Sequence, residues 1–97
     1  MKIMQDSESI EIRFTSRSTL LIDLKQNQIV FGSRKVDFSQ VRGFWKNYVV
    51  RRKKKRYYVV LLTNSWMDRI TPEIDEYDAD EIIKALIEVF GDDKYAR

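Results

Sequence analysis

Residues 44–63 read FWKNYVVRRKKKRYYVVLLT, in which two apolar halves flank six consecutive cations. Valine, tyrosine, phenylalanine and tryptophan are the residues that β-strands favour. The stretch therefore predicts a hairpin of two antiparallel strands, 44–50 and 57–63, paired symmetrically about the Lys53–Lys54 bond. Because neither lysine readily adopts the positive φ of a tight turn, we expect a looser connection of roughly four to six residues.

Shorter stretches on either side of this hairpin also read as strands. Apolar and polar residues alternate from Ile10 to Phe14, which is typical of a half-buried strand. A turn is expected at 26–28, and Thr71–Pro72 would end the last strand. The predicted strands are 8–15, 18–25, 29–32, 34–38 and 66–70.

The C-terminal part of the chain predicts one amphipathic helix over 80–90. Asp78 and Glu81 have the spacing of a capping box, and Gly91 stands where a C-terminal cap belongs. Apolar residues recur at helical spacing and form one broad stripe: Ile82, Ile83, Leu86, Ile87 and Phe90.

The predicted fold is mainly β, with a C-terminal helix. The length of 97 residues suits a single domain spanning 1–97, with frayed ends at 1–7 and 92–97. We expect a curved antiparallel sheet, or a partly open barrel, of about six or seven strands. The longest apolar run, 57–62, is far shorter than the ~18 residues of a membrane-spanning helix.

The composition favours binding over catalysis. Cysteine and histidine are absent, which removes thiolate chemistry and the commonest general base and metal ligand. Three glycines are too few for a phosphate-binding loop. We therefore expect a non-enzymatic binding module with no cofactor and no small-molecule substrate. Lack of cysteine also suits the reducing cytoplasm.

Charge is distributed unevenly along the chain. The formal net charge is +3, but without residues 51–56 the rest holds twelve basic and fifteen acidic residues, a net charge of −3. The basicity is thus one local run. An acidic segment at 73–81 opposes it and contains no lysine or arginine; its members are Glu73, Asp75, Glu76, Asp78, Asp80 and Glu81.

The order of these elements resembles the pleckstrin-homology-like (PH-like) superfold, particularly the small bacterial PH-like domains. The residues that carry the resemblance are LLIDL at 20–24, the turn at 26–28, IVFG at 29–32, VDFSQVRGF at 36–44, the long hairpin and the helix. The resemblance covers roughly residues 8–91. It implies a domain that binds phospholipid head groups, peptides or proteins.

The basic run with its neighbouring tyrosines is the candidate binding site. Its residues are Arg51, Arg52, Lys53, Lys54, Lys55, Arg56, Tyr48, Tyr57 and Tyr58. The partner that we favour is an acidic protein surface. Alternatives are an anionic phospholipid membrane, with peripheral attachment to it, and nucleic acid. A merely solvated loop is the simplest interpretation, and self-association of the run with the acidic segment is a further one.

A small metal-dependent nuclease is the enzymatic alternative. Asp23 and Lys25 have the D-x-K spacing, with Glu11 upstream as a second carboxylate that could help to hold Mg²⁺. An ordinary polar strand face explains the same residues more simply. Trp66 and Met67, beside Asp68, could mark an exposed contact, although we expect Trp66 in the core.

Overall fold

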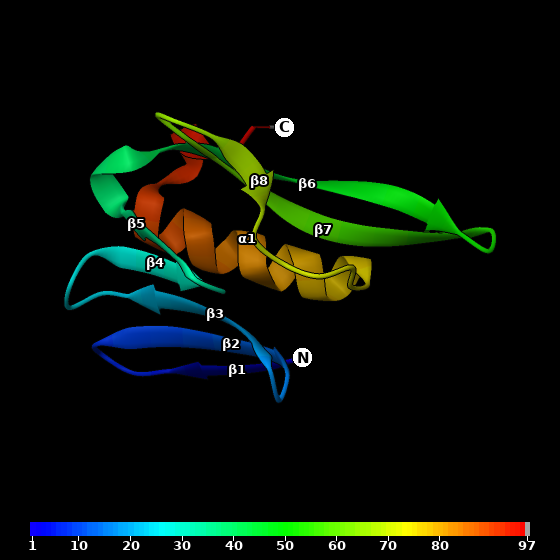
Figure 1. Ribbon diagram of the computed structural model, residues 1–97, viewed down its shortest axis with the longest axis horizontal. Helices are drawn as coiled ribbons and strands as arrows, with labels where there is room; N and C mark the ends of the chain where they lie inside the picture. Colours follow the sequence, from blue (N-terminus) through cyan, green and yellow to red (C-terminus); the bar gives the residue numbers. More distant parts are fainter. Residues whose placement is uncertain (97) are drawn as a thin grey trace. The chain divides into compact units, whose positions relative to one another are not determined.

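The computed structural model describes residues 1–96, and the chain divides into two compact units, Met1–Val41 and Arg42 onward (Figure 1). The fold is mainly β, as predicted, with two antiparallel sheets and one C-terminal helix. The elements are β1 Lys2–Gln5, β2 Ser9–Thr15, β3 Ser18–Asp23, β4 Gln28–Phe31, β5 Arg34–Asp37, the 3-10 turn η1 Phe38–Gln40, β6 Val41–Arg51, β7 Lys54–Thr63, β8 Met67–Arg69, α1 Glu76–Phe90 and η2 Asp92–Lys94.

The first unit is a five-stranded meander in which each strand pairs with the next, β1 to β5. Its register aligns the apolar positions that the sequence alternation marks. Ile10 pairs with Ile22, Ile22 with Ile29, and Ile29 with Val36, so one apolar row crosses four strands. All members of this row are buried, which makes this sheet face the apolar side of the unit.

Short polar side chains close the turns of the first unit. The Asp6 Oδ1 accepts hydrogen bonds from the amides of Glu8 and Ser9, and the Asp23 Oδ1 accepts from those of Lys25 and Gln26. Gly32 has a φ of 56° at the β4–β5 turn, a conformation that glycine adopts without steric cost.

The second unit is a three-stranded sheet, in the order β6-β7-β8, with α1 packed on β7. Val59 and Leu61 of β7 are fully buried, as are Ile82 and Leu86 of the helix. Side chains of a strand alternate between its two faces. Val59 and Leu61 therefore belong to one face, and Tyr58 and Val60 to the opposite one.

Helix α1 begins earlier than the sequence suggested. We expected a start at Asp78–Asp80, but Glu76 is the first helical residue. The cap is Asp75, whose side chain accepts a hydrogen bond from the Asp78 amide at 2.8 Å and so satisfies a free donor of the first turn. The expected cap at Gly91 is confirmed, with a φ of 93° and its amide bonded to the Ile87 carbonyl.

Residues 92–96 lie in the segment that we expected to fray, and they adopt a defined local structure. Asp92–Lys94 form η2, the Tyr95 ring stacks on Phe44 with centroids 5.8 Å apart, and the Ala96 amide donates to the Phe44 carbonyl. A Cβ on Gly43 would lie 3.2 Å from the Lys94 carbonyl oxygen. The close contact between these two backbone segments therefore favours glycine at position 43. Arg97 lies outside the described residues.

The expected number of strands needs correction. Residues 2–5, within the other segment that we expected to fray, form β1, whose backbone pairs with β2, Ile3 opposite Ile12. The described chain therefore holds eight strands, in two sheets, where we expected about six or seven in one curved sheet or partly open barrel. No helix among residues 1–96 is long and apolar enough to cross a membrane.

Candidate binding surface on the basic hairpin

The hairpin turn is tighter than its sequence suggests. β6 ends at Arg51 and β7 begins at Lys54, so Arg52 and Lys53 alone form the turn, and the expected longer loop is wrong. Their φ angles are 50° and 66°, both left-handed. Hairpins of this kind prefer Asn-Gly or Asp-Gly, because positive φ costs other residues about 1 kcal/mol each.

The turn also corrects the register of the hairpin. A two-residue turn at Arg52–Lys53 sets Arg51 opposite Lys54, whereas we expected symmetry about the Lys53–Lys54 bond. Counting back along both strands sets Tyr48 opposite Tyr57, in agreement with ring centroids 5.6 Å apart. In Figure 1 the hairpin continues past the N-terminal end of α1.

The six cations of the hairpin differ in their surroundings. The Arg51 guanidinium binds Glu73 through two hydrogen bonds, of 3.2 Å from Nε and 2.9 Å from Nη2. Arg56 donates to the Glu73 backbone carbonyl. Arg52, Lys53 and Lys54 are exposed and have no ion pair among the described residues. Lys55 is exposed as well, with its ammonium over the Tyr48 ring. These four cations, at and beside the turn, are the ones most open to an external anion.

The three tyrosines of the candidate site lie on two faces of the hairpin. Tyr48 is 46% exposed, packs beside Tyr57 and has the Lys55 ammonium 4.6 Å from its ring centre. Tyr58 is buried on the opposite face, beneath the Arg69 guanidinium at 3.7 Å. The structure therefore brings Tyr48 and Tyr57 together and separates Tyr58 from them.

One exposed aliphatic residue near the end of the hairpin, Val50, was not among the site residues predicted from the sequence. Val50 is 62% exposed, and strand alternation sets it on the face of Tyr48 and Lys55. Its valine neighbour, Val49, is only half-exposed. Two successive valines are typical of any strand, so the sequence did not single out Val50. Its exposure follows from the length of the hairpin in the structure.

The acidic segment 73–81 finds most of its partners within its own chain. Lys46 binds Glu76 at 3.0 Å and also Asp80, and the Asp80 hydrogen bond is the main reason that the pKa of Lys46 rises above its ordinary value. The Arg51 hydrogen bond lowers the pKa of Glu73, and Glu73 in turn raises that of Arg51. Few carboxylates remain for a second molecule, so self-association through this segment stays a hypothesis that we do not favour.

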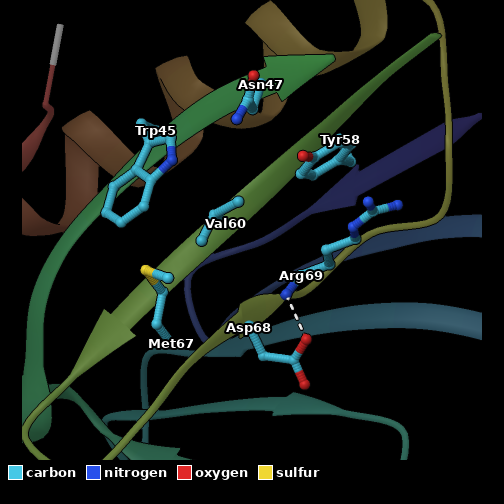
Figure 2. Close-up of a pocket in the computed structure, with 7 residues that line it drawn as sticks. All are labelled: Trp45, Asn47, Tyr58, Val60, Met67, Asp68 and Arg69. Carbon is cyan, nitrogen blue, oxygen red and sulfur yellow. Dashed lines mark hydrogen bonds between the residues drawn. The ribbon is translucent and has the colours of Figure 1, made fainter. Parts of the chain in front are cut away.

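A groove lies on the sheet face that carries Tyr58 and Val60 (Figure 2). It has a volume of about 280 Å³ and lies wholly within the second unit. All three strands contribute to its lining, which consists of Trp45, Asn47, Tyr58, Val60, Met67, Asp68 and Arg69. Met67 is 61% exposed, as the alternative interpretation of Trp66–Asp68 suggested, whereas Trp66 is only half-buried and not a fully buried core residue.

The residues of the nuclease alternative have structural partners. Glu11 forms an ion pair with Arg13 at 2.8 Å, and Asp23 accepts the two turn amides described above. Among residues 1–96, no three His, Cys, Asp or Glu side chains gather in a way that could hold a metal ion. No specific observation favours this alternative.

Comparison with known proteins identifies no relative of this chain. No protein family, no curated protein and no solved structure matches the chain. The assignment of function therefore depends on the geometry of the hairpin and the groove.

Proposed function

We propose that the chain is a non-enzymatic binding module that docks an acidic protein surface through its basic hairpin, residues 51–56. One observation carries the proposal: cations occupy a turn that strongly prefers other residues. Arg52 and Lys53 have left-handed backbones, and with Lys54 they lack an ion pair among the described residues. A solvated loop would gain stability from Asn-Gly at this turn. Retaining Arg-Lys there at an energetic cost suggests a role for the charges.

The chemistry of the hairpin suits carboxylates. Lysine and arginine form charge-assisted hydrogen bonds with carboxylate oxygens, and the bidentate Arg51–Glu73 pair is an example within this chain. The hairpin presents its cations on paired strands, so their backbone is already ordered before binding. A protein surface with clustered Asp and Glu would complement them.

We propose a PH-like arrangement as the framework of this module. An antiparallel meander, a three-stranded sheet and a C-terminal helix on that sheet follow one another along the chain. This order supports the resemblance drawn from the sequence. The additional strand β1 departs from the pattern that we expected.

An anionic membrane is the second candidate partner, because of two exposed residues beside the cations. Val50 and Tyr48 share a face with Lys55 near the end of the hairpin. An aliphatic and an amphipathic side chain of this kind suit the headgroup boundary, where each lysine or arginine adds about 1 kcal/mol. A cytoplasmic protein would then attach peripherally.

Direct binding measurements distinguish the partner classes. The probes are poly-L-glutamate, phosphatidylglycerol vesicles and a DNA duplex, each titrated at about 20 and about 150 mM salt. We expect poly-L-glutamate to bind, with an affinity that falls on the order of tenfold between the two salts, because exposed charges are screened. Absence of poly-L-glutamate binding at low salt would overturn the proposal, and tighter binding of vesicles or DNA would favour that alternative.

A further inference from the structure

The groove beside the hairpin offers a site that the basic residues alone do not explain. Tyr58 and Val60 form its floor, since both are buried, while Trp45 and the exposed Met67 stand beside them (Figure 2). Met67 pairs in register with Leu62, which is also partly exposed. Contiguous apolar side chains with a polar rim are typical of a recognition surface.

The size of the groove limits what it can hold. A cavity of about 150 Å³ accommodates a benzene ring, whereas sites for drug-sized ligands begin at about 300 Å³. The 280 Å³ groove therefore matches a single aromatic or large aliphatic side chain. The groove is open to solvent, as a side chain attached to a peptide requires.

The charges around the groove indicate the character of the peptide. The groove lining itself holds one carboxylate, Asp68, and one cation, Arg69, which lies 3.9 Å from Glu73. The excess of positive charge on this face therefore comes from residues nearer the hairpin turn. The hairpin register places Asn47 opposite Tyr58 and Arg51 opposite Lys54. Alternate residues of a strand share a face, so Tyr58, Arg56 and Lys54 follow one another on the groove face toward the turn.

We infer that the groove accepts one apolar side chain of an extended acidic segment in the partner protein. An extended chain and β7 have the same rise of about 3.4 Å per residue. With the apolar residue in the groove, a carboxylate four positions away comes level with the exposed Lys54. A carboxylate two positions away comes level with Arg56, whose guanidinium also donates to the Glu73 carbonyl. The inference rests on the proposed function, because it names the part of the acidic partner that is recognised.

A set of short peptides tests the inference on the full-length protein. The probes are acetyl-SGFSESESG-amide and acetyl-GSESESFGS-amide, which present phenylalanine before or after the glutamates, together with versions in which serine replaces phenylalanine. We expect one phenylalanine peptide to bind at low salt and to shift the indole N–H resonance of Trp45. Its serine version should bind at least about tenfold more weakly, since it has no side chain to bury.

A matched pair of variants localises the effect. Met67→Asp introduces a carboxylate at an exposed position of the groove and should weaken binding of the phenylalanine peptide at least about tenfold. Met4→Asp makes the same chemical change on β1, in the other unit, and should leave binding unchanged.

The outcomes separate this inference from the proposed function. Equal binding of phenylalanine and serine peptides, with no Trp45 shift, overturns the groove site while the basic hairpin keeps its role. Failure of every peptide and of poly-L-glutamate at low salt overturns both. Binding to phosphatidylglycerol vesicles alone also overturns both, in favour of the membrane.

Discussion

Arg52 and Lys53 occupy the two turn positions at which asparagine and glycine are preferred. Both have left-handed φ angles, and neither has an ion pair among the described residues. At the scale of single residues, we therefore expect that the residues giving this turn its greatest stability are not those giving it its strongest binding.

Replacing the turn residues separates these demands. Arg52→Asn with Lys53→Gly should raise the free energy of unfolding by about 1 kcal/mol, because Asn-Gly relieves the positive-φ cost. The same variant should bind poly-L-glutamate more weakly, since two cations are removed. Urea unfolding followed by circular dichroism measures the first effect and titration the second.

The matched control is Arg52→Ala with Lys53→Ala. It removes the same two charges but leaves a side chain at each left-handed position, so binding should fall without a gain in stability. If the Asn-Gly variant is no more stable than this control, the turn is not strained in the way that we describe.

Residue preferences explain why the turn was not predictable. Sequence rules assign tight hairpins to Asn-Gly or Asp-Gly, and this chain uses Arg-Lys. The observed register therefore differs from the predicted one by two residues. Because side chains alternate between faces, a shift of two residues leaves each side chain on the face that we predicted. Tyr48 and Val50 therefore lie on the same face as Tyr57, as the sequence implied, although their direct partners differ.

At the scale of elements, the Arg51–Glu73 pair links the hairpin to the acidic segment before α1. The pKa of Glu73 lies below its ordinary value of 4.5, chiefly because of its hydrogen bond with Arg51. A carboxyl whose pKa is lower in the folded state stabilises that state above its unfolded pKa. The contribution is lost as the pH falls through the folded pKa.

A comparison across pH tests this link. Glu73→Gln should be less stable than the unmodified protein at pH near 7, and the difference should shrink below the ordinary glutamate pKa of 4.5. Thermal unfolding between about pH 7 and about pH 3 measures it. Glu88→Gln, at an exposed helix position, is the control for the loss of one carboxylate and should change stability little near pH 7. A Glu73→Gln deficit that is the same at every pH would contradict the pairing.

Elements with strong periodicity were predictable, and those set by pairing were not. The strand at 9–15 follows from the alternation of Ile10 and Ile12, and the buried stripe of α1 follows from its helical spacing. β1 has no buried residue and exists because β2 pairs with it. The helix start was displaced because several acidic residues in succession could each serve as the cap.

At the scale of the whole molecule, the basic patch was predictable and the groove was not. Six adjacent cations are visible in the sequence, but the groove combines residues of β6, β7 and β8 that come together only when the strands pair. The sequence also could not show that the acidic segment finds partners within its own chain. Lys46 and Arg51 neutralise part of it.

Poly-L-glutamate binding by two charge-matched triple variants shows whether the hairpin itself is the binding surface. Lys53, Lys54 and Lys55 changed to glutamate move the net charge from +3 to −3, and so do Lys25, Lys35 and Lys84 changed to glutamate. All six positions are exposed, so we expect each variant to fold, with little change in stability beyond any effect of the Lys55–Tyr48 and Lys84–Glu81 contacts. The hairpin variant should lose binding at low salt, whereas the dispersed variant should retain most of it. Equal loss in both variants would mean that net charge alone governs binding, and would contradict a binding surface on the hairpin.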